Sequence, residues 1–340
     1  MDAIGIDTHK ATLAACLVDE LGSPLDERTF DNDPSGHRAL LDWASASPEA
    51  TIGVEGSSSF GAPVARFLIA AGRTVREVPP QLSRRERIRT RRPGKSDPTD
   101  ALAIARVTAR ERDLPPVRLV DASHEIQLLV EAREDVVSET TRIRNRLHAD
   151  LWVLVPGYGA TAANLTAVRH QATVARLLRC VGGVRAELAR ARLARLRALA
   201  AEERVLATRI AERVSGHPLL DLPGAGVLVA AKLIGEVGDI RRFRSSDALA
   251  ALAGVAPIPA SSGQTQRMRL NRGGNRQLNR ALYTIALAQA WHHPPAKAYI
   301  ARKRTEGKSW RDAIRALKRQ LVRTVFRLLQ VGARSLAMAA

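Results

Sequence analysis

Two aspartates that can bind a metal ion, Asp97 and Asp100, lie three residues apart within residues 95–101, KSDPTDA. Pro98 is favoured as the first residue of a helix, and Asp97 directly before it is a good N-cap. Since residues 101–107 follow a helical pattern, both carboxylates are expected on one face of the first helical turn. There they can hold a divalent cation. They can also serve the helix alone, as a cap and as an acid that interacts favourably with the helix dipole.

Two more acids, Asp7 and Glu55, stand at the ends of predicted strands. The apolar residues 3–8 end in Ile-Asp-Thr, and residues 51–56 end in Val-Glu-Gly. Ligand sites of α/β sheets lie at the carboxyl ends of strands. If these two strands are neighbours, both side chains enter one crevice, which the helix that starts at Asp97 can also reach. Four carboxylates in one crevice are hard ligands that suit Mg²⁺ or Mn²⁺, and paired ions of this kind support phosphoryl transfer.

The elements around these acids predict a mixed sheet with helices on its faces. Strands come first along the chain and then alternate with helices, which is the order expected of such a domain. Strands are expected at residues 3–8, 11–18, 28–31, 51–56 and 74–78, and helices at residues 34–46 and 62–71.

Long helices are predicted after a proline-containing linker at residues 110–119. Apolar residues at helical spacing predict a helix over residues 122–155. After a break at residues 155–159, helix is expected to resume and continue to about residue 214. Two such helices indicate an antiparallel pair or a coiled-coil arm, with a simple helical subdomain as the alternative. The arm suits dimerisation, and it can also bind RNA through Arg142, Arg144, Arg146, Arg190, Arg192, Arg195 and Arg197.

The composition indicates a polyanionic partner. The 340 residues carry a net charge of +19 with an isoelectric point of about 11.2, mostly through arginine, whose guanidinium matches phosphate geometry. A membrane surface is the competing partner, but no long apolar stretch is free of charges, which excludes a transmembrane segment. Cys16 and Cys180 fit no metal-site spacing, so a reduced, cytoplasmic protein is expected. With a nucleic-acid partner, association with the nucleoid is expected as well.

A run of basic residues at positions 83–95 directly precedes Asp97. Such a run is commonly a solvated face or a disordered loop. A phosphate backbone brought to the four acids would pass close to it, however, so charge and position favour nucleic-acid contact. The arginines concerned are Arg84, Arg85, Arg87, Arg89, Arg91 and Arg92.

A second basic cluster follows the serine pair Ser261-Ser262. A serine before a glycine in a loop is commonly a turn residue, and no histidine nearby in the sequence supplies a general base. Several guanidiniums beside a hydroxyl can, however, lower the cost of its ionisation and hold a phosphate. These guanidiniums belong to Arg267, Arg269, Arg272 and Arg276. The residues alone leave both interpretations open.

A glycine turn at residues 222–226, LPGAG, precedes a predicted helix over residues 227–236. This pattern resembles a helix–hairpin–helix motif, whose glycine amides contact phosphates without reading bases. A tight turn between two helices, with no contact to nucleic acid, is the alternative.

Three segments of the chain resemble the RuvC-like, DEDD-type transposases of bacterial insertion sequences, a family guided by a bridge RNA. These segments are residues 4–10 (IGIDTHK), 53–57 (GVEGS) and 95–101 (KSDPTDA). The Ser-Gly pair, the arginines after it and residues 272–282 (RGGNRQLNRAL) are similar to the family's second block, which carries a nucleophilic serine. The serine directly before the glycine is Ser262, so the resemblance selects it over Ser261.

The resemblance implies an α/β RNase H-like (RuvC-like) domain, here expected over residues 1–118. A helical coiled-coil arm over residues 119–215 and a mainly α-helical transposase domain over residues 216–340 follow it. The implied catalytic residues are Ser262 and the metal-binding acids Asp7, Glu55, Asp97 and Asp100, with Mg²⁺ or Mn²⁺ as the cofactor. The implied partners are donor and target DNA, a structured non-coding guide RNA, and further copies of the chain in a dimer or tetramer.

Two other functions are compatible with parts of this pattern. A metal-dependent nuclease that resolves DNA junctions would use the four acids with water as the nucleophile and would need no serine. A non-catalytic scaffold for RNA or DNA would need no metal, but four buried acids without a metal would repel one another. An insertion-sequence transposase, or DNA recombinase, is therefore the predicted function.

Overall fold

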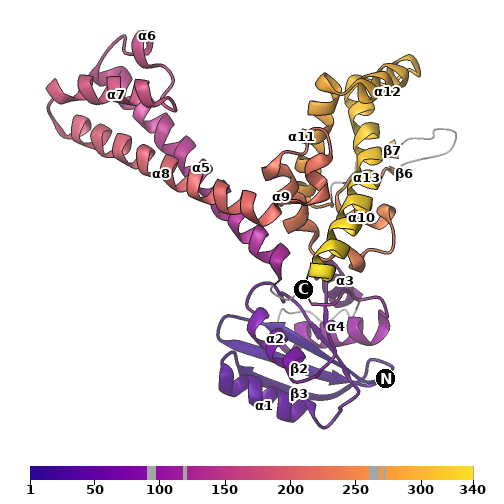
Figure 1. Cartoon of the computed structure of the whole chain (residues 1–340). Coiled ribbons are helices and arrows are strands. Elements are labelled where there is room, and N and C mark those ends of the chain that lie inside the picture. Colours follow the sequence, from indigo (N-terminus) through magenta and orange to yellow (C-terminus); the bar gives the residue numbers. More distant parts are fainter. Residues whose placement is uncertain (90–96, 118–120, 260–267, 270, 272, 340) are drawn as a thin grey trace. The chain divides into compact units, whose positions relative to one another are not determined.

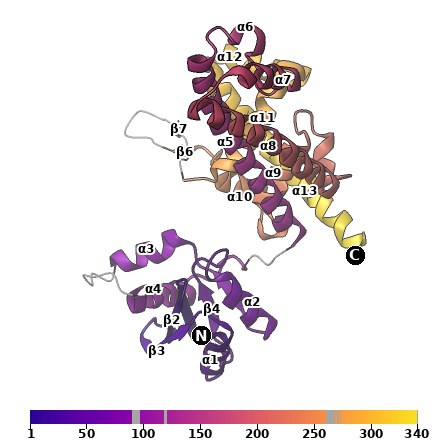
Figure 2. The ribbon, with the colours of Figure 1, turned by 90° about the vertical axis from the view of Figure 1, so that its left-hand side faces the viewer.

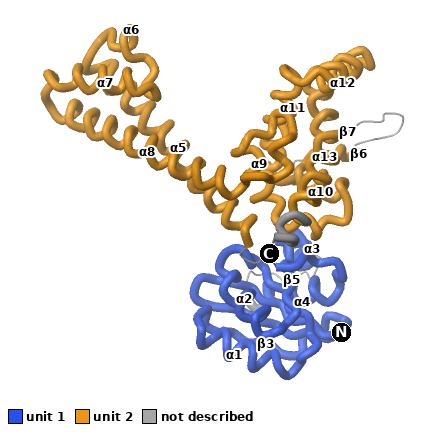
Figure 3. Tube along the Cα trace, in the orientation of Figure 1, with its two compact units in different colours: residues 1–119 blue, residues 120–340 orange. Residues whose placement is uncertain are grey.

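In the computed structural model, the described residues are 1–89, 97–117, 121–259, 268–269, 271 and 273–339. They form two compact units, Met1–Leu119 and Val120–Ala340, which are coloured separately in Figure 3. The finer division into three domains stays a prediction.

The first unit is built on a mixed sheet (Figure 1). Its elements are β1 (Ala3–Thr8), β2 (Thr12–Val18), β3 (Pro24–Asp31), α1 (Pro34–Ala44), β4 (Thr51–Val54), α2 (Ala62–Ala70), β5 (Val75–Glu77), α3 (Pro80–Arg89) and α4 (Asp97–Arg110). Among the described residues the strand order is β3-β2-β1-β4-β5. The pairs β1–β2 and β2–β3 are antiparallel, whereas β1–β4 and β4–β5 are parallel. The predicted mixed sheet is confirmed, and it is consistent with an RNase H-like domain.

Helices cover both faces of this sheet. Because successive side chains of a strand point to opposite faces, each strand contributes to two apolar clusters. On one face, Ile52 packs in a cluster with Leu40 of α1 and Leu68 of α2. On the other face, Ala3 belongs to a cluster that includes Ala101 of α4.

Three elements of this unit differ from the prediction. β3 begins at Pro24 rather than at residue 28. α3 occupies part of the basic run, where no helix is predicted from the sequence. Pro80 can start this helix because the first helical residue needs no N–H. α4 begins at Asp97 itself, so Asp97 is the first helical residue rather than the predicted N-cap.

The second unit is mainly helical in its described residues. Its elements are α5 (Ala122–Leu154), α6 (Gly159–Ala162), α7 (Val168–Leu177), η1 (Leu178–Cys180), α8 (Val184–Val214), η2 (Pro218–Asp221), α9 (Val227–Val237), η3 (Ile240–Arg242), α10 (Ser246–Leu252), β6 (Ile258–Pro259), β7 (Met268–Arg269), α11 (Arg276–His292), α12 (Pro294–Thr305) and α13 (Trp310–Ala339). The strands β6 and β7 pair antiparallel.

The long helices α5 and α8 lie side by side (Figure 1). The prediction of α5 is confirmed, but the prediction of one continuous second helix is wrong, because α6, α7 and η1 come before α8. The helix is interrupted at residues 163–167 and again at residues 181–183, where Gly183 has a φ of 90° that is favourable only for glycine. Ion pairs join the two helices, including Arg195 Nε with Glu139 Oε1 at 2.8 Å. The coiled-coil character of this pair stays a prediction.

The predicted helix after the glycine turn is confirmed as α9. Its residues Ala230, Ala231 and Leu233 are buried in an apolar cluster that also takes in residues of α5, α8, α11 and α13. The helix–hairpin–helix likeness of this region stays a prediction. Of the helices in the described ranges, none is long and apolar enough to cross a membrane.

Candidate active site

The strands that carry Asp7 and Glu55 are parallel neighbours. In the register of β1 and β4, Ile6 lies opposite Val54. The amide of Glu55 donates to the carbonyl oxygen of Ile6 at 3.2 Å, and the hydroxyl of Thr8 donates to the carbonyl oxygen of Glu55 at 2.9 Å. The two acids therefore lie one residue beyond the last pair of the β1–β4 register, at the carboxyl ends of these two strands.

The helix α4 packs closely on the face of the sheet that these acids share. A Cβ atom built on Gly5 would overlap the backbone of α4 at Ala101, so only glycine permits this approach. Because side chains alternate along a strand, Asp7 lies on the same face as Gly5. By the same alternation Glu55 lies on the same face as Gly53, where an added Cβ would overlap a side chain of α4.

Of the two predicted acids on α4, Asp100 is paired with an arginine of α3. Its side chain is 8% exposed, and its Oδ1 lies 3.0 Å from Nη1 of Arg87. Ser83, four residues before Arg87 on the same helix, is fully buried. The hydroxyl of Ser83 donates to Oε2 of Glu55 at 2.6 Å. One side of α3, which lies alongside α4 in Figure 2, thus contacts two of the predicted metal ligands.

Asp7 also has a basic neighbour, because Nε2 of His9 lies 3.3 Å from its Oδ2. Within the described part of the chain, no three His, Cys, Asp or Glu side chains are grouped so that they could hold a metal ion. The side chain of Asp97 is outside that part. Glu55 contacts Ser83, and Asp100 contacts Arg87.

A further acid, Glu77, is found at this edge of the sheet and is absent from the predicted set. It ends β5 and lies opposite Val54 of β4 in the parallel register. The hydroxyl of Ser57 donates to its carboxylate. Burial, together with the nearby charge of Glu55, raises the pKa of Glu77 to about 7, against the opposing effect of hydrogen bonds from the backbone of Ser57 and Gly56. The signal that selects Glu55, an acid at the end of a predicted strand, also applies to Glu77.

The predicted arginines have different surroundings. Arg84 and Arg85 are exposed on α3, and Arg276 is exposed at the start of α11. Arg87 is partly buried against Asp100. The described residues do not include Ser261, Ser262, Arg91, Arg92, Arg267 and Arg272, and they include only the backbone of Arg89 and Arg269.

The glycine-rich block after Ser262 is anchored onto neighbouring helices. The side-chain oxygen of Asn275 caps α11 by accepting from the amides of Gln277 at 2.8 Å and Leu278 at 3.0 Å. Its side-chain amide donates to Oε2 of Glu236 on α9 at 2.7 Å. A Cβ on Gly274 would overlap the backbone of Gly254. Asn275 and Gly274 therefore both have a structural role, which accounts for an asparagine and a glycine at these positions.

The arginines of the helical arm divide into engaged and exposed side chains. On α8, the engaged ones bind groups of the arm itself: Arg190 donates to the carbonyl of Leu178, Arg192 pairs with Asp150, Arg195 pairs with Glu139 and Arg197 donates to the carbonyl of Gln171. On α5, Arg142 and Arg146 are exposed. With Arg280 of α11 they line an open groove of about 780 Å³.

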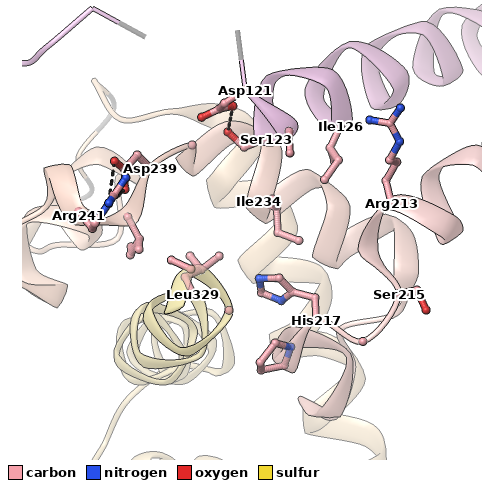
Figure 4. A pocket seen from close by; sticks show the side chains of 17 residues that line it. Asp121, Ser123, Ile126, Arg213, Ser215, His217, Ile234, Asp239, Arg241 and Leu329 are labelled. Carbon is pink, nitrogen blue, oxygen red and sulfur yellow. Dashed lines mark hydrogen bonds and ion pairs between the residues drawn. The ribbon is translucent and has the colours of Figure 1, made fainter. Parts of the chain in front are cut away.

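A cavity of about 510 Å³, drawn in Figure 4, is lined by none of the predicted catalytic residues. The apolar side chains of Ile126, Ile234 and Leu329 border it together with His217. Burial lowers the pKa of His217, whose Nδ1 accepts from the amide of Leu219 at 3.1 Å. The histidine thereby caps a short helix, which is a structural role.

Comparison with known proteins links both units to one family. Residues 4–156 match the profile of a DEDD-type, IS110-like transposase family, and residues 216–301 match that of the transposases of the IS116/IS110/IS902 family. The first match contains Asp7, Glu55, Asp97 and Asp100, and the second contains Ser262 and Arg276.

Three curated relatives are similar along almost their whole length. The uncharacterized 42 kDa protein of insertion element IS900 from Mycobacterium paratuberculosis is 28% identical, over 96% of this chain and 95% of its own. The 44.8 kDa protein of insertion element IS116 from Streptomyces clavuligerus is 25% identical, over 96% and 94%. The pilin gene-inverting protein of Moraxella bovis is 26% identical, over 94% and 92%.

The two family matches occur in the same order as the blocks found in the sequence. The relatives include proteins of insertion elements and a gene-inverting protein. The chain therefore belongs to the DEDD-type transposases of insertion sequences, and it is a DNA-cleaving recombination enzyme.

Proposed function

We propose that this enzyme cleaves and exchanges DNA strands with two sets of residues, the acids Asp7, Glu55, Asp97 and Asp100, and the serine Ser262. The observation that carries the first set is the placement of Asp7 and Glu55 at adjacent ends of the parallel strands β1 and β4. The helix α4, which bears the other two acids, is packed on the same face.

The four acids are proposed to hold the divalent metal that the DEDD family implies. The donor set fits such an ion, because carboxylate oxygens are the ligands that Mg²⁺ and Mn²⁺ prefer. When bound, the metal would supply charge stabilisation at the scissile phosphate. The partly buried positions of Asp7 and Asp100, with side chains 14% and 8% exposed, would limit competition from water.

Ser262 is proposed to be the nucleophile. Its hydroxyl oxygen would form a bond to the scissile phosphorus and lose its proton, while the bond between phosphorus and the 3′ oxygen breaks and that oxygen leaves as a hydroxyl. The product would be a 5′-phosphoserine link that stores the energy of the broken bond for rejoining. Arg276, exposed at the start of α11, is available to a phosphate brought to this block.

Donor and target DNA, and a structured non-coding guide RNA, are the proposed nucleic-acid partners. The net charge of +19 and the exposed arginines of α3 support polyanion binding, while the guide RNA rests on the family resemblance. Active assemblies are proposed to be dimers or tetramers that combine the acids of one copy with the serine of another.

A cleavage assay tests this proposal. The full chain is incubated with Mg²⁺, DNA that carries the ends of its element, and RNA transcribed from the flanking non-coding region. We expect wild type and the matched control Asp42→Asn, an exposed acid of α1, to cleave. We expect Asp7→Asn and chelated samples not to cleave. Cleavage that persists in Asp7→Asn would contradict the assignment of the acids.

The competing function, a junction nuclease that uses water, predicts a different result for the serine. In that case Ser262→Ala would cleave as well as wild type, whereas Asp7→Asn would be inactive. Under the proposed function both variants are inactive, and Ser261→Ala retains activity.

A further inference from the structure

Two residues of α3, Ser83 and Arg87, contact two of the proposed metal ligands from one side of that helix. The hydroxyl of Ser83 lies 2.6 Å from Oε2 of Glu55, and Nη1 of Arg87 lies 3.0 Å from Oδ1 of Asp100. Their separation of four residues places them on the same helical face. α3 therefore reaches both the strand and the helix that contribute acids to the site.

We infer that Arg87 is the counter-cation of Asp100 in the metal-free enzyme and exchanges with the divalent metal when the site loads. This inference rests on the proposed metal site. It assigns to Arg87 a positioning role, distinct from the phosphate contact that its place in the basic run predicts.

Asp100 is more deeply buried than Arg87, and this difference determines which of the two side chains depends on the ion pair. The side chain of Asp100 is 8% exposed, and that of Arg87 is 31% exposed. A carboxylate so deeply buried is strongly disfavoured without a cation, because water does not replace the lost partner. The guanidinium of Arg87 already reaches solvent, so water can solvate its charge after it leaves Asp100. Asp100 therefore keeps a cation in both states, and only the identity of that cation changes.

The exchange needs no movement of α3 itself. Glu86, which is buried, forms an ion pair with Arg110 of α4, with Nη1 2.6 Å from Oε2. Val78, Ile104 and Leu114 form an apolar cluster against which Leu82 packs. These contacts hold α3 on α4 independently of Arg87. Ser83 can thus keep Glu55 oriented while the Arg87 side chain turns away.

Mn²⁺ binding to the full chain without nucleic acid tests the inference. Free Mn²⁺ is followed by electron paramagnetic resonance in wild type, Arg87→Gln and Arg87→Lys. The matched control is Arg84→Gln, which removes the same charge from an exposed position of the same helix. Arg87→Gln is expected to bind Mn²⁺ roughly three- to tenfold more tightly than wild type, because no ion pair has to be broken. The Mn²⁺ affinities of Arg84→Gln and Arg87→Lys are expected to be closer to that of wild type than the affinity of Arg87→Gln is.

Thermal unfolding gives a second readout that does not depend on activity. Without metal, Arg87→Gln is expected to melt below wild type and Arg84→Gln, and saturating Mn²⁺ is expected to remove that difference. Equal Mn²⁺ affinity of Arg87→Gln and wild type, or weaker binding by Arg87→Gln, would overturn the exchange alone. Failure of all four proteins to bind Mn²⁺ would overturn the metal site and the exchange with it.

Discussion

The hydroxyl oxygen of Ser83 lies 2.6 Å from Oε2 of Glu55 and donates a hydrogen bond to it. Ser83 is fully buried, so this bond is shielded from water and fixes one oxygen of the acid at the end of β4. A partner that orients a metal ligand in this way commonly matters almost as much as the ligand itself. Ser83 belongs to the basic run before Asp97, in which the sequence predicts a role only for the arginines.

Replacing Ser83 by alanine removes this bond and leaves Glu55 free to adopt other rotamers. We expect Ser83→Ala to bind Mn²⁺ about tenfold more weakly than wild type, because the ligand must be ordered on binding. The measurement is a Mn²⁺ titration of the full chain. Ser45→Ala, which removes the exposed hydroxyl at the end of α1, should bind as wild type does. A Ser83→Ala protein with wild-type affinity would show that the bond does not position Glu55.

Because the pKa of Glu77 is raised, we predict that the stability of the protein without metal depends on pH. Its pKa rises from 4.5 to about 7 on folding, chiefly through burial. The folded state therefore holds the proton more tightly than the unfolded chain. The resulting stabilisation is complete below about pH 4.5 and is lost as the pH rises through 7. For this partly exposed group we expect a contribution of about 1–3 kcal/mol to the free energy of unfolding.

Urea unfolding at pH 5 and pH 8, with a chelator present, measures this contribution. We expect Glu77→Gln, which resembles the protonated form, to be more stable than wild type at pH 8 and to show a smaller change between the two pH values. Glu49→Gln, at an exposed position, should keep the wild-type profile. The prediction fails if Glu77→Gln and wild type lose the same stability over this range.

Replacing Gly5 by alanine is predicted to displace α4 from the sheet. A Cβ at this position would overlap the α4 backbone at Ala101 and Ala105, so Gly5→Ala must displace the helix that carries Asp97 and Asp100. Overpacking of this kind costs about 3 kcal/mol. We expect faster hydrogen–deuterium exchange in α4 and weaker Mn²⁺ binding. Gly182→Ala, where an added Cβ meets nothing within 4 Å, should change neither property, and an unaltered Gly5→Ala protein would contradict the close packing.

The elements that carry the acids could be predicted because their signals are local. β1 and β4 are short apolar runs that end in an acid, and α4 starts at an Asp-Pro pair with an apolar stripe behind it. The position of the acids at strand ends and at a helix start then grouped Asp7, Glu55, Asp97 and Asp100 into one set, and the family resemblance supported that grouping. Glu77 carries the same local signal at the end of β5 and could have been included.

α3 could not be predicted from apolar periodicity because its buried side is largely polar. Ser83, Glu86 and Arg87 are stabilised there by Glu55, Arg110 and Asp100, which come from other elements. The arginines of α8 present the same difficulty. Arg195 looks available for RNA in the sequence, yet its partner Glu139 lies 56 residues away on α5. Partners so distant along the chain are visible only after folding.

The central claim is that metal-binding acids and a serine act together on one phosphate, and the covalent intermediate tests it most directly. The full chain is mixed with Mg²⁺, guide RNA and element-end DNA labelled on either side of the cleavage position, and the products are separated under denaturing conditions and digested for mass spectrometry. The account predicts DNA attached through a 5′ phosphate to the peptide containing Ser262, and no adduct with Asp7→Asn or Ser262→Ala. DNA cleaved at the wild-type rate by Ser262→Ala, with no adduct to any residue, would contradict it.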